Sequence, residues 1–238
     1  MRIKKFLPAA AVALCLSVFL FLMIKSARTV TLTTFAVPNV PAKKVLIDPG
    51  HGGEDGGAVC GGVTEKDINL SVSLDTADLL FLCGFDVEMT RKTDDALSKE
   101  GENVKQRKYS DMKTRLEMYN SAGNSAVISI HQNKFSDSAS HGAQVFYSPN
   151  NEKSATLAQS LRHSLRSMLQ PDNERECKAA GKDIYLLKNA ENPAVIVECG
   201  FISNKNEREM LVTDEYQKQI ALAVCTGFID YYNTNGCD

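Results

Sequence analysis

Four residues of this sequence combine side chains suited to metal binding or proton transfer with positions at the ends of expected elements. His51, His131 and Glu198 each follow a short apolar run, and Glu65 follows the glycine-rich loop that begins after His51. Two histidines and one carboxylate are the ligands of many catalytic zinc sites, which leave a fourth position open for water or substrate. A second carboxylate then serves as general base. The chain can supply such a hydrolytic site, with His51, Glu65 and His131 as ligands and Glu198 as base.

Each of these residues also has an ordinary structural role open to it. A histidine after a strand commonly packs or bonds to backbone, and Glu65 in a first helical turn would favour the helix dipole while facing water. Glu198 could pair with a lysine or arginine, because an unpaired carboxylate at the end of a buried strand is costly. Cys60 and Cys199 are rival ligands near these motifs, although thiolates suit closed structural sites better.

The elements that must position these residues alternate between strand and helix. A capping box at Thr64 and Asp67 is expected to open the first helix. Strands are predicted at residues 45–47, 85–89, 126–130, 142–147, 184–187 and 194–197, and helices at about residues 65–82, 109–119, 157–168 and 216–231. This order predicts an α/β fold: a single layered domain with a twisted, mostly parallel or mixed β-sheet of about six strands and helices on both faces. Sites in such sheets form at the carboxyl ends of strands.

The N-terminal segment differs from the rest of the chain. Three basic residues precede an apolar run at residues 6–24, as in an export signal, and the run is near the length that spans a bilayer. We therefore expect residues 1–28 to be a cleaved signal or a membrane anchor, which places the domain outside the cytoplasmic membrane, either secreted or anchored on its outer face. Residues 29–42 carry no charge and include two prolines, as a linker would. Residues 43–238 are expected to form the catalytic domain.

The charge balance of that domain restricts its partners. Five of the 27 basic residues and none of the 29 acidic residues precede residue 43, which leaves 22 against 29 and a net charge of −7. Nucleic acid and anionic membrane surfaces are poor partners for such a domain. Membrane contact is expected only through the N-terminal segment. The seven cysteines show neither the spacing of a zinc ribbon nor that of a disulfide framework.

Four motifs, taken together, resemble the zinc-dependent N-acetylmuramoyl-L-alanine amidases (amidase type 3). They are Leu-Ile-Asp-Pro-Gly-His-Gly-Gly at 46–53, Thr-Glu-Lys-Asp at 64–67, Ser-Ile-His-Gln-Asn at 129–133 and Val-Glu-Cys-Gly-Phe-Ile-Ser-Asn at 197–204. The resemblance implies that His51, Glu65 and His131 bind Zn²⁺ and that Glu198 is catalytic. It also implies a peptidoglycan substrate, cut at the amide between the lactyl group of muramic acid and the first L-alanine of the stem peptide.

Within that family the chain looks most similar to the germination-specific cortex amidases of spore-forming bacteria. The similarity lies in the uninterrupted domain after a hydrophobic segment and in the run Tyr-Leu-Leu-Lys-Asn-Ala at 185–190. It implies a role in spore cortex processing and a location associated with the forespore. A partner protein for zinc loading or activity would be compatible with this reading. Cys199 departs from the aliphatic residue expected after the catalytic glutamate, which raises the question of redox sensitivity.

Four further residues are candidates for substrate binding. Asn133 and Asn204 stand beside the motifs and could bond to the sugar or peptide, while Arg91 or Lys188 could meet a stem-peptide carboxylate. Two other functions also fit the residues: an exported zinc peptidase that cuts within the stem peptide, and a wall-binding protein without catalysis. The retained carboxylate at Glu198 argues against the second.

Overall fold

The computed structural model describes residues 44–121 and 123–235. The expected signal or anchor and the linker therefore lie outside the described residues. In the part of the chain that is described, no helix has the length and apolar character needed to cross a membrane.

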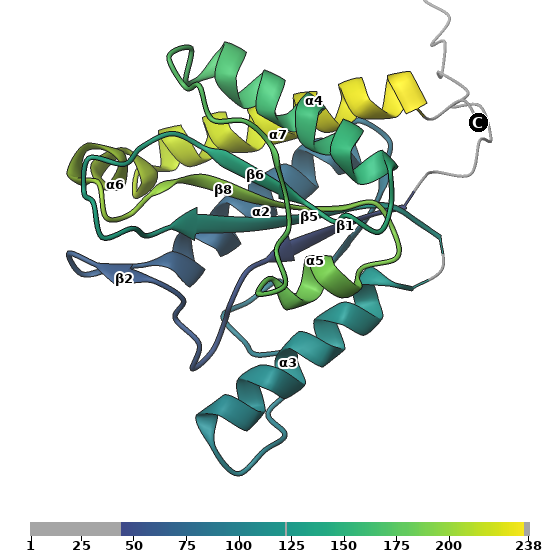
Figure 1. The fold of residues 1–238 in the computed structure, drawn as a ribbon, viewed down its shortest axis with the longest axis vertical. Helices are drawn as coiled ribbons and strands as arrows, with labels where there is room; N and C mark the ends of the chain where they lie inside the picture. Colours follow the sequence, from purple (N-terminus) through teal and green to yellow (C-terminus); the bar gives the residue numbers. More distant parts are fainter. Residues whose placement is uncertain (1–43, 122, 236–238) are drawn as a thin grey trace, which may run out of the picture. The chain divides into compact units, whose positions relative to one another are not determined.

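Six strands form one mixed sheet (Figure 1). Along the sheet they are β4 (Asp86–Met89), β1 (Lys44–Pro49), β5 (Asn124–Asn133), β8 (Ala194–Phe201), β6 (Gln144–Tyr147) and β7 (Lys178–Ala179). The first four run parallel, β6 is antiparallel to β8, and β7 is parallel to β6. A separate antiparallel pair, β2 (Val59–Cys60) and β3 (Val63–Thr64), follows β1. The predicted α/β class and strand number are confirmed.

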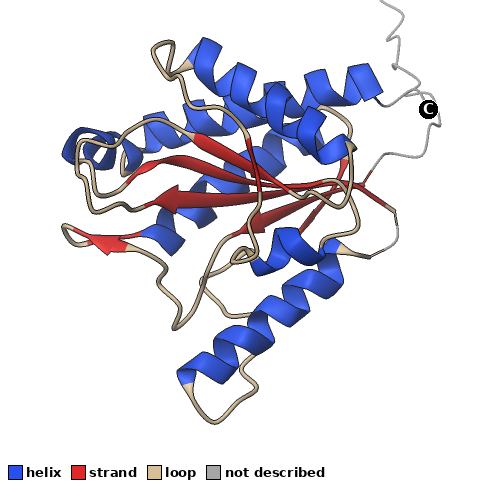
Figure 2. Cartoon of the chain, viewed as in Figure 1, coloured by secondary structure: helices blue, strands red, loops and turns tan. Residues whose placement is uncertain are grey.

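Helices cover both faces of this sheet, as Figure 2 shows. One core lies between the sheet and the helices α2 (Glu65–Leu82), α4 (Lys153–Met168) and α7 (Asp214–Asn235). A smaller core lies on the other face, under α3 (Val104–Tyr119) and α5 (Tyr185–Asn189), and the short α6 (Lys205–Leu211) follows β8. Along β1, Val45 and Ile47 enter the first core and Leu46 the second. Burial on both faces explains why the central strands are apolar without alternation.

The structure corrects two details of the expected elements. Residues 184–187 were predicted to be a strand, but they enter α5, whose buried Leu187 is followed three residues later by buried Ala190. A short apolar run does not separate strand from helix by periodicity, and this run packs as a helical turn against the second face. Thr64 does precede α2, but its side chain makes no capping hydrogen bond. Its backbone pairs with Val59 in the small hairpin instead.

Two central strands are also longer than predicted. β5 continues through His131 to Asn133, and β8 continues through Glu198 to Phe201. His131 and Glu198 are register partners on these adjacent strands. Both residues are therefore held by sheet hydrogen bonds rather than by a loop, which fixes their relative positions.

Candidate metal centre

His51 lies in a loop in which three consecutive residues have positive φ angles. Its φ of 62° is in the left-handed region, and Gly52 and Gly53 that follow also have positive φ. Just before it, a Cβ on Gly50 would stand 2.3 Å from two ring atoms of His131. Only glycine permits this approach. The glycine at position 50 therefore lets the loop bring His51 against the histidine of β5.

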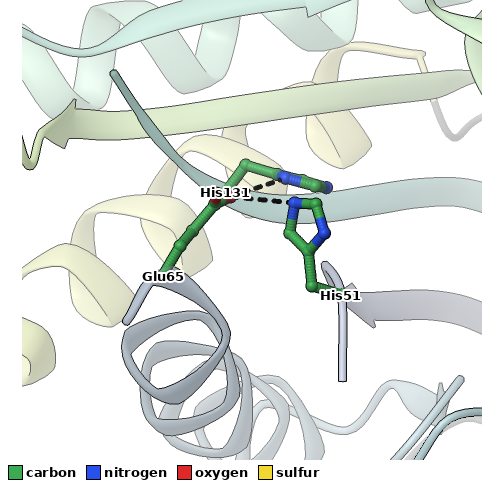
Figure 3. A group of neighbouring side chains, drawn as sticks. All are labelled: His51, Glu65 and His131. Carbon is green, nitrogen blue, oxygen red and sulfur yellow. Dashed lines mark hydrogen bonds and ion pairs between the residues drawn. The ribbon is translucent and has the colours of Figure 1, made fainter. Parts of the chain in front are cut away.

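The ligand atoms of His51, Glu65 and His131 converge (Figure 3). The Oε1 atom of Glu65 lies 3.3 Å from His51 Nε2 and 2.9 Å from His131 Nδ1. One ligand atom from each residue lies within 4.8 Å of the other two, so the group could hold a metal ion. Two imidazoles and a carboxylate are a donor set that suits zinc. The loop at residues 52–63 thus returns Glu65 to the side of His51.

The carboxylate of Glu65 is fixed at the start of α2 rather than facing water. Its side chain is only 5% exposed. Oε2 accepts a hydrogen bond from the backbone of Ala58 at 2.7 Å, and Oε1 accepts bonds from Asn69 Nδ2 and from the backbone of Gln132. A first-turn glutamate serving only the helix dipole would not be enclosed in this way. The buried carboxylate calls for a positive or donating partner, and both histidines supply one.

Electrostatics around Glu65 and His51 favour the charged forms of these two side chains. Burial alone would raise the pKa of Glu65, but hydrogen bonds from His131 and His51 outweigh it and hold this pKa well below its usual range. Burial would likewise lower the pKa of His51, but the neighbouring carboxylates of Asp55 and Glu65 raise it to about 9. The site therefore attracts positive charge, as a cation-binding centre must.

Glu198 approaches the centre from the next strand. Its Oε2 atom is buried and has no hydrogen-bond partner among the described residues. Burial, together with the negative charge of Glu65, raises the pKa of Glu198 to about 7, and His131 opposes this rise. A buried carboxylate oxygen without a partner is costly, and such atoms are found where chemistry requires them. The lysine or arginine partner of the structural alternative is absent from the described residues around Glu198.

A buried charge network supports the backbone under His51. Asp48 is fully buried at the end of β1 and pairs with Arg115 of α3. It also accepts hydrogen bonds from three hydroxyl groups, those of Thr90, Tyr119 and Ser129. Arg115 Nη2 in turn donates to the carbonyl oxygen of His51 at 2.6 Å. No local sequence pattern predicts this network, because only the fold brings α3 against β1.

Of the four weaker substrate candidates, two have side chains bonded to the backbone and a third lies away from the cavity beside the centre. Arg91 is 4% exposed and donates to the carbonyl oxygens of Pro49 and Gly50, so its guanidinium is engaged by the backbone at the end of β1, and its contact with substrate stays a prediction. The side-chain oxygen of Asn204 caps α6. Lys188 is exposed near the end of α5 and does not line the cavity described below. Asn133, partly buried at the end of β5, stays a candidate.

The two cysteines considered as rival ligands do not join the centre. Cys199 is fully buried, and burial raises the pKa of its thiol to about 12, which keeps it protonated and unreactive. Cys60 Sγ lies 3.5 Å from Arg208 Nη1, in the hairpin that precedes α2. The structure therefore favours the His–Glu–His set over any thiolate.

A cavity of about 300 Å³ opens beside the centre, between α3 and α5. His51 and His131 line one end of it, and Met112, Ile184 and Leu186 supply an apolar wall. The cavity therefore reaches the candidate metal centre.

Comparison with known proteins agrees with this architecture. The model of a family described as N-acetylmuramoyl-L-alanine amidase matches residues 45–230. The chain belongs to this amidase family. All three converging ligands and Glu198 lie inside the matched range.

Individual relatives in the amidase family are similar over most of the domain. The chain is 34% identical over 195 residues to the germination-specific N-acetylmuramoyl-L-alanine amidase of Bacillus subtilis, covering 82% of this chain and 81% of that protein. The CwlD amidase from Clostridioides difficile, solved in complex with the GerS lipoprotein, superposes with a TM-score of 0.78 at 36% identity, covering 81% of this chain and 100% of that one. The amidase AmiC2 of Nostoc punctiforme gives a TM-score of 0.62 at 26% identity, covering 80% and 97%.

Proposed function

We propose that this protein is a zinc-dependent N-acetylmuramoyl-L-alanine amidase that hydrolyses the amide between N-acetylmuramic acid and L-alanine in peptidoglycan. The observation that carries the proposal is the convergence of His51, Glu65 and His131 within 4.8 Å of one another. Family membership supports the reaction, because the matched model is described by this activity.

The residues present fit a zinc ion. His51 Nε2, the Glu65 carboxylate and His131 Nδ1 would hold it, because these atoms face one another. When bound, zinc supplies Lewis-acid polarisation of the scissile carbonyl and makes a nearby water more acidic. The protein's contribution is to hold three ligands in fixed places: in the loop directly after β1, in the first turn of α2, and on β5.

Glu198 is proposed to move the proton. As a carboxylate it would take a proton from the attacking water, and it would then deliver that proton to the departing nitrogen of L-alanine. Burial raises its pKa to about 7, a value that suits a group which must both accept and release a proton near neutral pH. Its register opposite His131 places it beside the centre without making it one of the three converging ligands.

The cellular role is proposed from the relatives. The name of the Bacillus subtilis protein assigns it to germination, and this chain covers 81% of that protein. We extend that role here as spore cortex processing by an exported protein. The Clostridioides difficile amidase was solved with a lipoprotein partner. An accessory protein for zinc loading or activity is therefore part of the proposal.

Digestion of purified cortex peptidoglycan by the full-length protein tests this function. New amino termini on L-alanine, with intact glycan strands, are expected with zinc and not with a chelator or with Glu198→Gln. New termini inside the stem peptide would identify a peptidase and overturn the proposal. Retention on the polymer without any release would identify a wall-binding protein.

A further inference from the structure

The second ring nitrogen of His51 is engaged away from the metal centre. While Nε2 faces Glu65, Nδ1 lies 2.8 Å from Oδ2 of Asp55. Ring nitrogens of ligand histidines generally donate to a carboxylate in this way, which fixes the tautomer and the ring orientation. With Nδ1 bonded to Asp55, Nε2 is the ring nitrogen that a cation can bind when it displaces the proton there.

Asp55 is itself held by several contacts. Its Oδ1 atom lies 2.7 Å from Lys108 Nζ and accepts a hydrogen bond from the backbone of Gly57 at 3.2 Å. Two backbone hydrogen bonds, at 2.9 and 3.1 Å, join Asp55 to Gly52 across the turn after His51. The carboxylate is thus fixed in both position and orientation, and one of its fixed partners comes from α3.

We infer that Asp55 and Lys108 form a positioning pair that sets the metal affinity of His51. The inference rests on the proposed metal site and adds two residues to it that do not converge on the metal position. Asp55 acts on the imidazole, and Lys108 acts only through Asp55. Because Lys108 belongs to α3, the pair couples the placement of that helix to the ligand.

An adjacent ion pair provides a comparison, because it connects the same loop to α3 without contacting a ligand histidine. Glu54 and Arg107 stand one residue before Asp55 and Lys108 and also join the loop to α3. The hydrogen bonds between Glu54 and Arg107 involve none of the three proposed ligands. If the loop needed only attachment to α3, both pairs would matter equally. The chain therefore offers a matched control for charge, location and helix.

The test measures zinc affinity by competition with a chelator for the full-length protein and its variants. Removing the carboxylate partner of a ligand histidine weakens metal binding about 10–100-fold, and this is the loss expected for Asp55→Asn. Lys108→Met should weaken binding less, and Arg107→Met should leave it unchanged. Denaturant midpoints identify any variant that has lost its fold.

A double variant tests whether Lys108 acts through Asp55. Combining Asp55→Asn with Lys108→Met should weaken zinc binding no further than Asp55→Asn alone, because contributions within one chain of contacts are not additive. Nitrogen NMR of the His51 ring in folded Asp55→Asn should show loss of the Nδ1-protonated tautomer. Wild-type affinity in Asp55→Asn, or additive effects in the double variant, would overturn the inference.

Zinc binding by His51→Ala distinguishes a failure of the positioning pair from a failure of the proposed metal site on which it rests. His51→Ala should abolish the binding that the wild type shows. Zinc binding that His51→Ala abolishes but Asp55→Asn leaves intact would reject the positioning pair and keep the site. A wild-type protein that binds no zinc would reject both.

Discussion

Arg115→Met should strongly destabilise the domain, because it removes one partner of a buried ion pair. The Asp48 side chain is 0% exposed and that of Arg115 is 4% exposed. Breaking such a pair by removing one partner costs about 3–5 kcal/mol, since the remaining charge stays buried. A domain has roughly 5–15 kcal/mol of stability in total, so this loss would be a large part of it.

Urea unfolding followed by circular dichroism measures the effect. With a slope of about 2 kcal/mol per molar urea, the predicted loss moves the midpoint down by roughly 1.5–2.5 M. Arg107→Met is the control, because its ion pair with Glu54 is at the surface, where such pairs contribute little. The midpoint of the control should stay at the wild-type value. An Arg115→Met midpoint equal to that of the control would refute the reasoning.

Four other outcomes follow from the site and the network beneath it. Glu198→Gln should keep zinc, measured by metal analysis, while turnover falls about 10²–10⁴-fold, the usual contribution of a general acid–base group. Gly57→Ala should lose zinc affinity in a chelator titration, because its Cβ would stand 2.6 Å from Glu65 Oε2 and from His51 Cδ2 at a φ of +68°. A chelator should abolish amide hydrolysis by the wild type, and added zinc should restore it. Asp48 has a pKa held below its unfolded value, since Arg115 and three hydroxyls outweigh the effect of burial. Its contribution to stability is therefore fully present above about pH 5 and is lost progressively as the pH falls below the unfolded value of about 3.9 and through the lower folded pKa; Asp48→Asn should flatten that part of the stability profile.

Much of the fold and all three converging side chains could be predicted from sequence. Apolar runs buried on both faces identify parallel strands, and the carboxyl ends of such strands meet at one edge. His51 and His131 follow directly from that rule. Glu65 was a candidate ligand from its position after the glycine loop, but only the family resemblance favoured that role over a first-turn glutamate that faces water.

The parts that sequence could not give depend on long-range contacts. Arg91 looked available for a substrate carboxylate, but the fold turns it onto the carbonyl groups of Pro49 and Gly50. Arg115 showed no signal at all, because a buried arginine and a surface arginine on a helix have the same local pattern. The helix α5 was mistaken for a strand because five residues carry too little periodicity to decide between them.

Anomalous diffraction at the zinc edge, from crystals of the purified protein grown with zinc, tests the central claim most directly. We predict one strong peak bounded by His51 Nε2, the carboxylate of Glu65 and His131 Nδ1, at distances of about 2.0–2.2 Å. A peak bound by other residues, or a fully zinc-loaded crystal with no peak among these three side chains, would contradict the account.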